Sequence, residues 1–425
     1  MVTPVAPAQL LKILFDTAVT AAMPQHRIKA YLPPKPEGKV VVVGAGKSAA
    51  AMAKAVEAAW DGKLEGLVIT RYGHHVATDQ IEVVEAAHPV PDSNGVEAAQ
   101  RIFDLVTPLT EDDLVLGLIS GGGSSLFTLP PAGLTLTELA DINRQLLQSG
   151  ASITEMNAVR KNLSCSSGGR LAAAAYPAQV VSLIISDVPG DDLAVIASGP
   201  TVGDTVTAEN ARQVIQKYDI AVSPQVTEYL KDESNPVIHP DDPRLQKTEN
   251  ILIAAPQQSL EAAAQVARNY GYTPLILGDS IQGEAKDVGI VHAGIAQQTV
   301  HHHQPMAPPC IILSGGETTV TVKSSAGKGG RNSEFLLSLA IALDGLPGVY
   351  AIACDTDGID GNGDNAGALL TPDVLAKSQA QGLPASQYLQ AHDSYTFFAA
   401  LDALVVTGPT LTNVNDFRAI LVDPC

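Results

Sequence analysis

Short aliphatic runs that alternate with alanine-rich segments of helical spacing constrain this 425-residue chain more than any other feature. In the first half, strands are predicted at Val40–Val43, Leu67–Thr70, Glu82–Glu85, Leu114–Ile119 and Val180–Ile185, and helices at Ser48–Trp60, Ser93–Val106 and Thr135–Leu147. Strands that alternate with helices pair in parallel, and the helices cover both faces of the sheet. This half is therefore predicted to form a three-layer α/β domain.

The chain changes character between Pro224 and Lys247, where Asn-Pro, His-Pro and Asp-Pro pairs lie in a polar stretch. Such pairs favour turns, so we predict one domain over residues 1–245 and a second over residues 246–425. In the second domain, strands are expected at Ile251–Ala254, Thr273–Leu277, Ile311–Leu313, Glu317–Lys323 and Val349–Cys354, and helices at Ser259–Tyr270, Gly283–Gln298 and Ser333–Leu343. Because one of these strands directly follows a Gly-Gly turn, we expect a mixed sheet.

The charge balance and the cysteines narrow the classes of function. The chain has 26 lysines and arginines against 45 aspartates and glutamates, a net charge of −19, which argues against a nucleic-acid partner. No apolar run reaches about 18 residues, so we expect no membrane span. The first residues carry Asp16 inside an apolar stretch and predict an amphipathic helix rather than a signal peptide. Four scattered cysteines suit a reducing compartment, and we expect a cytoplasmic protein.

A strand, a glycine-rich turn and a helix follow one another at Val41–Ala49. The free N–H groups and the dipole of such a helix start favour an anion. A Walker A loop would need a glycine where Val41 stands, so that motif is incomplete. Lys47 lies at the helix start, where its charge opposes the dipole. Its presence indicates an anionic partner more than the alternative, a plain tight turn.

Two further glycine-rich segments follow predicted strands. The first consists of Ser120, Gly121, Gly122, Gly123, Ser124 and Ser125, and the second, Ser314–Thr319, contains Gly315, Gly316 and Glu317. Successive backbone N–H groups in such loops form concave anion sites. Three consecutive glycines carry an entropy cost that a simple turn does not require. Both segments are therefore predicted to bind phosphate groups.

Carboxylates also follow predicted strands. Asp187 comes directly after one strand, and Asp355 and Asp357 come after another. Ligands of open α/β sheets bind at the carboxyl ends of strands, and hard oxygen ligands suit Mg²⁺. A calcium loop of the EF-hand type is excluded, because Ala366 stands where that loop needs a glutamate. The alternative for both segments is an acidic turn.

Two arginines are placed to bind an anion. Arg160 lies in the basic segment Asn157–Lys161, and Arg331 lies beside Asn332 in a glycine-rich loop that opens a helix. A guanidinium group at such a position can bind phosphate or carboxylate through two parallel hydrogen bonds. The alternatives are a charged helix surface for Arg160 and a solvated loop for Arg331.

Taken together, these motifs resemble the class II glycerate 2-kinases, whose C-terminal half is called the MOFRL domain. The matching segments run in order along nearly the whole chain: His88–Asp92, Ser120–Ser124, Asn157–Lys161, Ser186–Asp191, Ala197–Thr201, Ser314–Thr318, Gly329–Asn332, Asp355–Asp360, Thr407–Thr410 and Thr412–Asp416. The chain departs from the family's pattern at Ser164–Ser167, where a basic residue is more common, and at Ser333, where Gln or Thr is common. Some relatives carry the name hydroxypyruvate reductase.

The resemblance implies a Rossmann-like three-layer N-terminal domain and a smaller α/β C-terminal domain with a mixed sheet, with the active site in the interdomain cleft. It also implies that D-glycerate is phosphorylated to 2-phosphoglycerate with ATP and Mg²⁺. Lys47 and Arg331 match the family's key cationic residues. A homodimer stays open as the assembly, and no nucleic acid or membrane partner is expected.

Under this interpretation, the glycine loops bind the triphosphate, while Lys47 and Arg331 neutralise the transferring phosphoryl group. Arg160 pairs with the glycerate carboxylate. One or two of the three aspartates Asp187, Asp355 and Asp357 hold Mg²⁺ or orient the 2-hydroxyl group. The expected nucleotide contacts are Gly44, Gly46, Ser120, Gly121, Gly122, Gly123, Ser124, Gly315, Gly316, Glu317 and Asn332.

Two other functions stay open. The first is an NAD(P)H-dependent hydroxypyruvate reductase. This interpretation is based on Gly44, Gly46 and Ala49, which match the dinucleotide fingerprint GxGxxA, and on Glu65, which lies near the acidic position of that fingerprint. Hydride transfer does not require several phosphate-type loops together with an acidic cluster. A non-catalytic nucleotide-binding protein would explain the glycine loops, but it leaves the charged residues in them without a role.

Overall fold

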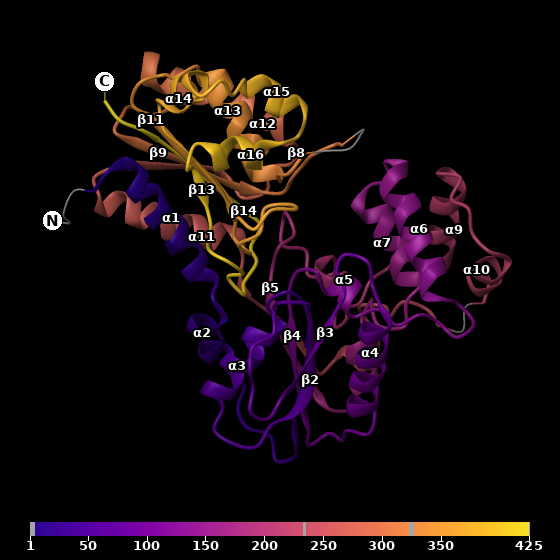
Figure 1. Ribbon diagram of the computed structural model, residues 1–425. Helices are drawn as coiled ribbons and strands as arrows, with labels where there is room; N and C mark the ends of the chain where they lie inside the picture. The colour runs from indigo at the N-terminus through magenta and orange to yellow at the C-terminus, as the bar shows by residue number, and fades with distance from the viewer. Residues whose placement is uncertain (1–4, 233–234, 323–326, 425) are drawn as a thin grey trace. The chain divides into compact units, whose positions relative to one another are not determined.

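The computed structural model describes residues 5–232, 235–322 and 327–424, and the chain divides into two compact units (Figure 1). The N-terminal unit comprises residues 24–186 and 191–253, and the C-terminal unit comprises residues 1–23, 187–190 and 254–425. The division differs from the prediction in two ways. The main boundary falls after Ile253 rather than after residue 245, and the first helix, α1 (Pro7–Ala22), belongs to the C-terminal unit.

The sheet of the N-terminal unit has the strand order β3-β2-β1-β4-β5-β6. Its strands are β1 (Val40–Ala45), β2 (Glu65–Arg71), β3 (Glu82–Ala86), β4 (Leu114–Ile119), β5 (Gln179–Ile185) and β6 (Thr248–Ala254). The first five pair in parallel, as predicted, and the order is that of a Rossmann fold. The segment Ile251–Ala254, which we expected in the second domain, lies instead in β6 of this sheet.

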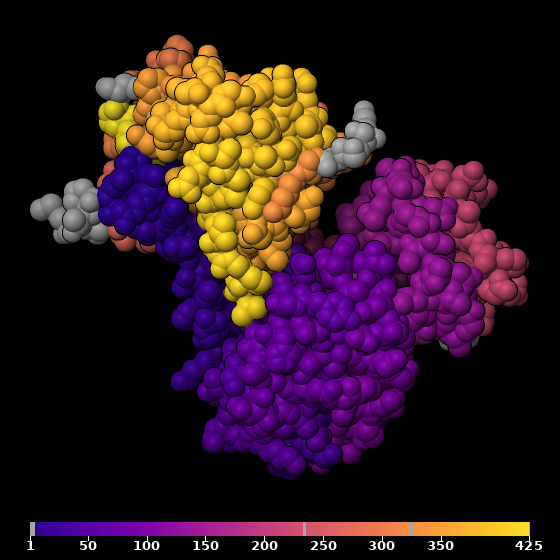
Figure 2. All heavy atoms as spheres, viewed as in Figure 1, coloured from indigo at the N-terminus to yellow at the C-terminus, as the bar shows by residue number. Residues whose placement is uncertain are grey.

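Helices of the N-terminal unit connect and cover these strands. They are α2 (Pro24–Arg27), α3 (Ala49–Ala59), α4 (Ser93–Val106), α5 (Gly123–Leu126), α6 (Leu136–Ser149), α7 (Ile153–Asn162), α8 (Arg170–Ala175), α9 (Ala208–Lys217) and α10 (Pro224–Tyr229). Helices α6, α7, α9 and α10 share an apolar core of their own, which includes Leu146, Val159 and Val226. Figure 2 shows these helices as a lobe that projects from the sheet-bearing part of the same unit.

The C-terminal unit is built on a mixed sheet, as predicted, with the strand order β13-β12-β11-β14-β9-β7. Its strands are β7 (Thr273–Gly278), β9 (Cys310–Gly316), β11 (Val349–Asp355), β12 (Gly367–Leu370), β13 (Leu404–Val405) and β14 (Asp416–Val422). Only β7 and β9 pair in parallel within this sheet. Two short strands, β8 (Gly283–Glu284) and β10 (Thr318–Thr319), pair separately. Of the strand predicted at Glu317–Lys323 only β10 forms, and Lys323 lies outside the described residues.

Helices cover both faces of this second sheet. They are α11 (Pro256–Asn269), α12 (Ala285–His302), α13 (Arg331–Leu343), α14 (Val374–Ala380), α15 (Ala385–Gln390) and α16 (Ser394–Ala400). The apolar side of α1, with Leu14 and Phe15, packs with α11 on one face, and α12 and α13 pack on the other. Helix α1 therefore joins the C-terminal unit because its apolar side completes that unit's core.

Strand β14 was not predicted, although it lies at the centre of the second sheet. Phe417, Ala419 and Leu421 face the α1 side, and Ile420 and Val422 face the opposite side. A strand covered on both faces is apolar at successive positions. Here Arg418 interrupts the apolar run, so the pattern is broken at one residue.

His292 of α12 is buried in the core of the C-terminal unit. Its Nδ1 atom lies 2.8 Å from the Val288 carbonyl oxygen, and its Nε2 atom lies 3.1 Å from the Ser314 hydroxyl. The ring contacts Phe335 edge-on, with ring centroids 5.1 Å apart. Burial lowers the pKa of His292 to about 4, so the folded protein keeps this ring neutral.

We expect acid to destabilise the protein through His292. The unfolded chain binds a proton near its ordinary pKa of 6.5, whereas the folded chain does so only near 4. The free energy of unfolding should therefore fall by up to about 3 kcal/mol as the pH drops from 6.5 to 4, with no further loss from this group below 4. In the parent protein the urea midpoint of unfolding should fall as the pH drops across this range, and this slope should be smaller in His292→Asn. The control His301→Asn, at the exposed end of the same helix, should keep the original slope; an unchanged slope in His292→Asn would contradict the assignment.

Candidate functional site

Two glycine-rich loops lie side by side at the carboxyl end of the first sheet, because β1 and β4 are neighbouring strands. The Lys47 N–H donates to the Gly121 carbonyl oxygen over 2.8 Å, and the Ser48 N–H donates to the Ser120 hydroxyl over 3.0 Å. A Cβ atom on Gly46 (φ +142°) would lie 2.1 Å from the Ser120 hydroxyl oxygen, so only glycine fits there. The two loops thus form one structure with Lys47 at its centre.

Several donors of these loops are left without a protein partner. Within residues 5–232, 235–322 and 327–424, no acceptor is found for the backbone N–H groups of Gly121 and Gly122. The buried Ser48 hydroxyl, 0% exposed, likewise has no hydrogen-bond partner among these residues. Buried donors in folded proteins nearly always find an acceptor. Donors that converge beside a lysine at a helix start fit the oxygens of a phosphate group.

The other residues predicted for this region take separate places. Gly44 lies within β1, where a Cβ atom would collide with the Leu118 carbonyl oxygen at 2.0 Å. Gly123 begins the single turn of α5, and Ser124 follows it on the surface. His88 approaches the loop from the end of β3, because a Cβ atom on Gly122 would lie 3.0 Å from its ring.

A cavity of about 320 Å³ opens beside this loop within the N-terminal unit, and Arg160 lines it. The Arg160 Nε atom donates to the Asn143 side-chain oxygen over 2.7 Å. In the part of the chain that the structure describes, no carboxylate lies within ion-pair distance of Arg160. Burial lowers the pKa of this guanidinium, which nevertheless stays charged near neutral pH. The cavity therefore contains a positive charge that the protein leaves uncompensated.

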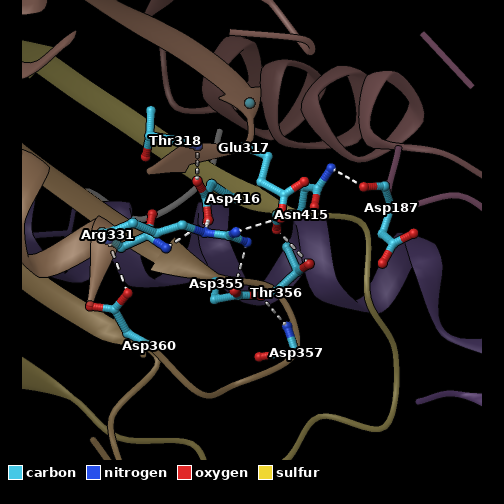
Figure 3. Close-up of polar contacts among 12 residues, drawn as sticks. Asp187, Glu317, Thr318, Arg331, Asp355, Thr356, Asp357, Asp360, Asn415 and Asp416 are labelled. Carbon is cyan, nitrogen blue, oxygen red and sulfur yellow. Dashed lines mark hydrogen bonds and ion pairs between the residues drawn. The ribbon is translucent and has the colours of Figure 1, made fainter. Parts of the chain in front are cut away.

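In the C-terminal unit, Arg331 is the centre of a charged cluster (Figure 3). It begins α13 and donates to Asp416 over 2.8 Å, to Asp355 over 3.0 Å and to Glu317 over 2.7 Å. These carboxylates lie at the ends of three neighbouring strands, because β14 pairs with both β9 and β11; Asp416 and Asp355 are in β14 and β11, and Glu317 directly follows β9. The register places Asp416 opposite Asp355 on one side and opposite Gly316 on the other.

A second set of contacts holds this cluster in place. Asp416 also accepts a hydrogen bond from the Asn332 amide over 2.7 Å, and it forms an ion pair with Arg418. Asp360 accepts the backbone N–H groups of Asn332 and Ser333 over 2.9 and 2.8 Å, together with the Ser333 hydroxyl. Asp360 therefore caps the start of α13, where a carboxylate also benefits from the helix dipole.

Burial and charge act in opposite directions on these groups. Burial alone would lower the pKa of Arg331, but the carboxylates Asp416, Asp355 and Glu317 outweigh it and hold that pKa well above its usual value. Burial lowers the pKa of Arg418, and it raises the pKa of Asp360 despite three hydrogen bonds. Arg331 thus stays fully charged, and its side chain is held in one orientation.

The predicted aspartates Asp187 and Asp357 lie in the same unit as this cluster. The Asn413 amide donates to the Asp187 carboxylate over 3.1 Å, and the Asn415 amide donates to the Asp187 carbonyl oxygen. The Asp357 N–H donates to the Asp355 carboxylate over 3.0 Å. The described residues contain no group of three or more histidine, cysteine, aspartate or glutamate side chains that could by themselves hold a metal ion. Mg²⁺ commonly uses one or two carboxylates plus phosphate oxygens and water, and the all-oxygen donors here fit that mode.

Gly315 and Gly316 do not form a loop, contrary to the prediction. The strand β9 continues through Gly316 and pairs with β14 up to its end. A Cβ atom on Gly316 (φ +119°) would lie 2.3 Å from the Ile281 nitrogen, and the Gly315 carbonyl oxygen accepts from Arg418 over 3.3 Å. Close backbone packing therefore requires glycine at Gly316, while a Cβ atom on Gly315 would lie 3.2 Å from the Asp416 carbonyl oxygen.

Ser48 was not predicted as a site residue, and three residues of the C-terminal unit were also missed from the sequence: Asp360, Asp416 and Arg418. Asp360 and Asp416 stand inside segments that were singled out, but nothing in the spacing distinguished them from their acidic neighbours. Arg418 did carry a signal, because a charged residue within an apolar strand must be paired when it is buried. Its only carboxylate partner within ion-pair distance among the described residues is Asp416.

The acidic residue that supported dinucleotide binding is at the wrong end of the sheet. Glu65 begins β2, opposite Val41, and forms an ion pair with Lys39 over 3.4 Å. The glycine turn follows the other end of β1, where Ala45 stands opposite Ile69. Four strand residues separate Glu65 from that end, about 13 Å. Dinucleotide folds place their ribose-binding carboxylate at the carboxyl end of β2, and this chain has Arg71 there.

No helix among the described residues has the length and apolar character that crossing a membrane requires. Comparison with protein families matches residues 10–231 to a domain of unknown function, DUF4147, and residues 310–416 to the MOFRL family. The chain is 52% identical to a protein of Agrobacterium vitis that carries the provisional name hydroxypyruvate reductase, over 98% of this chain and 95% of that protein.

Two comparisons with a protein of Thermotoga maritima cover almost the entire chain. Its D-glycerate 2-kinase is 40% identical over 96% of this chain and 98% of the relative. The crystal structure of the glycerate kinase from that organism superposes with a TM-score of 0.88, covering 98% of this chain and 99% of the other. The chain therefore belongs to the family of glycerate kinases that combine a DUF4147 domain with a MOFRL domain.

Proposed function

We propose that this chain is a D-glycerate 2-kinase that transfers the γ-phosphoryl group of ATP to the 2-hydroxyl of D-glycerate with Mg²⁺. The observation that carries the proposal is the set of unpartnered donors at Ser48, Gly121 and Gly122, which converge beside Lys47. The similarity to proteins named D-glycerate 2-kinase and glycerate kinase supports the same activity. ATP would supply the phosphoryl group, and Mg²⁺ would offset the charge of its oxygens.

The N-terminal unit would bind and polarise the phosphates. The N–H groups of Gly121 and Gly122 would donate to phosphate oxygens, with Ser120 fixing the shape of the loop through its bond to Ser48. Lys47 would neutralise charge on the transferring group. Phosphoryl transfer needs positioning and charge neutralisation rather than covalent catalysis, and these residues supply both.

The C-terminal unit would contribute Arg331 and the oxygen ligands. Glu317 is the most exposed carboxylate bound to Arg331, with 47% of its side chain exposed against 8% for Asp355 and 0% for Asp416. A phosphate oxygen would therefore compete with Glu317 for the guanidinium group, while the two buried aspartates hold the Arg331 side chain in its orientation. The three aspartates Asp187, Asp355 and Asp357 are the residues that would hold Mg²⁺ or orient the 2-hydroxyl.

Arg160 would bind the carboxylate of glycerate. It is a charged donor in a cavity where none of the described residues places a carboxylate beside it, and a carboxylate ligand would satisfy two of its N–H groups at once. The acid would then share the cavity wall with the glycine loop, since Gly122 and Ser124 also line it.

The activity can be tested directly on the purified full-length chain. With D-glycerate, ATP and Mg²⁺, we expect ADP release and a phosphorylated product whose ³¹P spectrum matches 2-phosphoglycerate. Parallel reactions with hydroxypyruvate and NADH or NADPH should show no cofactor oxidation, because Glu65 is not placed to bind a ribose. Cofactor oxidation without ADP release would select the reductase instead, and neither reaction would favour a binding protein.

A further inference from the structure

The cavity beside the glycine loop has two chemically different walls. One wall consists of hydroxyl groups and glycine, with Gly122, Ser124, Ser125, Thr128 and Ser198. The other is mostly apolar: α6 and α7 contribute Leu139, Ile142, Leu146, Leu147 and Val159, and the segment after α7 contributes Leu163, Ser164 and Ser167. At the rim, Leu147 and Val90 are 62% and 63% exposed, and Val90 stands between the lining prolines Pro89 and Pro91. A ligand of this cavity is therefore expected to have a polar side and an apolar side.

The polar groups in the apolar wall favour an anion. The Asn143 oxygen is occupied by Arg160, so the remaining groups of this pair, the Asn143 amide nitrogen and the terminal nitrogens of Arg160, are donors. Among the described residues Arg160 has no carboxylate partner. One terminal nitrogen of Arg160 lies 4.0 Å from the Met156 sulfur, which is only a weak acceptor. A guanidinium without a carboxylate partner recognises a carboxylate ligand by charge and by geometry.

The cavity is too large for a three-carbon acid. Its volume of about 320 Å³ corresponds to about ten water molecules. A glycerate bound to Arg160 would leave the half-buried Leu139 and the exposed Leu147 of α6 in contact with water, whereas Ile142 and Leu146 are buried in the core. Small-molecule sites are normally filled by their ligand, with apolar surface against apolar surface.

We infer that this cavity is the acid site and that it takes 2-hydroxy acids with an apolar substituent beyond the hydroxyl-bearing carbon, not only glycerate. This inference rests on the proposed function for the reaction that follows binding. The 2-hydroxyl oxygen forms a bond to the γ-phosphorus of ATP, and the bond from that phosphorus to the bridging oxygen breaks. ADP leaves with the electron pair, and the hydroxyl proton passes to solvent.

A nucleoside fits the same cavity less well. If the phosphates of a nucleotide occupied the glycine loop, its uncharged base would meet the uncompensated Arg160 in the apolar wall. The charge would then stay without a counter-ion, which is costly in a buried place. An acid places its carboxylate at Arg160 and its hydroxyl toward the glycine wall, so both walls are satisfied.

Binding is tested separately from turnover. Calorimetric titrations of the full-length protein, with Mg²⁺ and a non-hydrolysable ATP analogue, would compare glycerate with 2,3-dihydroxybutanoate, 2,3-dihydroxypentanoate and the polar 2,3,4-trihydroxybutanoate. Each buried methylene is expected to tighten binding about fourfold, so the pentanoate should bind more than tenfold tighter than glycerate. The trihydroxy acid should gain nothing. Tightest binding of glycerate, or equal gain from the polar extension, would overturn the inference.

Variants locate the effect in this cavity. Leu147→Asn should reduce the preference for the pentanoate over glycerate to less than about threefold, because it removes apolar surface at the rim without opening the core. The matched control is Ile153→Asn, a residue of similar exposure, 49%, that does not line the cavity; its preference should be unchanged. An unchanged preference in Leu147→Asn would count against this cavity.

Arg160→Gln distinguishes the two occupants. It should weaken binding of glycerate and of the longer acids by about 10–100-fold, as expected for a charged hydrogen-bonding group, and leave the KM for ATP unchanged. A raised KM for ATP with unchanged acid binding would place the nucleotide here and overturn the inference. The proposed function is judged separately, by ADP release. If ADP is released with glycerate but the longer acids bind no tighter, the proposed function holds and the inference fails. If the longer acids bind tighter but no ADP is released, the inference about the cavity holds and the proposed function fails.

Discussion

Replacing Lys47 by methionine is expected to lower kcat by about 10²–10³-fold, because the variant removes one positive charge at the place where phosphate charge is to be neutralised. Lys47 begins the turn between β1 and α3, and its backbone joins the two glycine loops through the bond to Gly121. Methionine keeps the length of the side chain and the backbone bond, so the fold should be retained. Steady-state ADP release with glycerate as substrate measures the effect.

The matched control for Lys47 is Lys54, which lies two turns further along the same segment, in α3. Lys54 forms surface ion pairs with Asp79 over 3.0 Å and with Glu57 over 3.6 Å, and its side chain is 44% exposed. Lys54→Met should leave kcat within about twofold, since exposed ion pairs contribute little. If Lys47→Met kept the turnover of the parent enzyme, Lys47 would have no part in phosphoryl transfer.

Arg331→Gln is expected to reduce both activity and stability. Three carboxylates share this guanidinium, and Asp416 has no exposed side-chain surface. Removing the cation leaves these negative charges close together, at a cost of about 3 kcal/mol in the free energy of unfolding. If Arg331 acts as proposed on the transferring group, the rate should also fall by at least about 10²-fold, because a positive charge that stabilises the transition state is lost. Urea unfolding and steady-state kinetics on the same preparation measure the two effects.

A double variant separates the structural contribution of Arg331 from the catalytic one. Arg331→Gln combined with Asp355→Asn removes one of the repelling carboxylates and should recover part of the lost stability, yet its rate should stay well below that of Asp355→Asn alone. The surface control Arg101→Gln, which breaks an exposed ion pair with Glu82, should change neither quantity appreciably. Recovery of the rate together with stability would mean that Arg331 acts only through the fold.

The parallel sheet and most of its loops could be predicted from local pattern. The aliphatic runs that became β1 and β4 are short, are bounded by glycine, and each precedes a helical segment. Such signals depend on residues close together in the chain, and they also located Lys47 and the serine–glycine loop. The place of β6 could not be read in this way, because which sheet a strand joins depends on the edge left open beside β5.

The second unit shows where local pattern fails. Strand β14 carries Arg418 in its centre, and this charge is tolerated only because Asp416, two residues earlier, and Thr318, from another strand, supply its partners. The glycines Gly315 and Gly316 looked like an anion loop, whereas both lie in a strand and the neighbouring chain at Ile281 is what requires glycine at Gly316. In both cases the reason for the residue lies in a contact between segments far apart in sequence.

The sequence alone determined the chemistry of this protein: which glycines, lysines, arginines and aspartates are available, and that they follow strands, where the sheet leaves backbone donors free. Tertiary structure decided how these groups are combined. Strand pairing brought Glu317, Asp355 and Asp416 around one arginine. The packing of α7 placed Arg160 in a cavity where the described residues offer no carboxylate as its counter-ion. Charge and hydrogen-bonding capacity are properties of single residues, but pairing and burial depend on the neighbours that only the folded chain supplies.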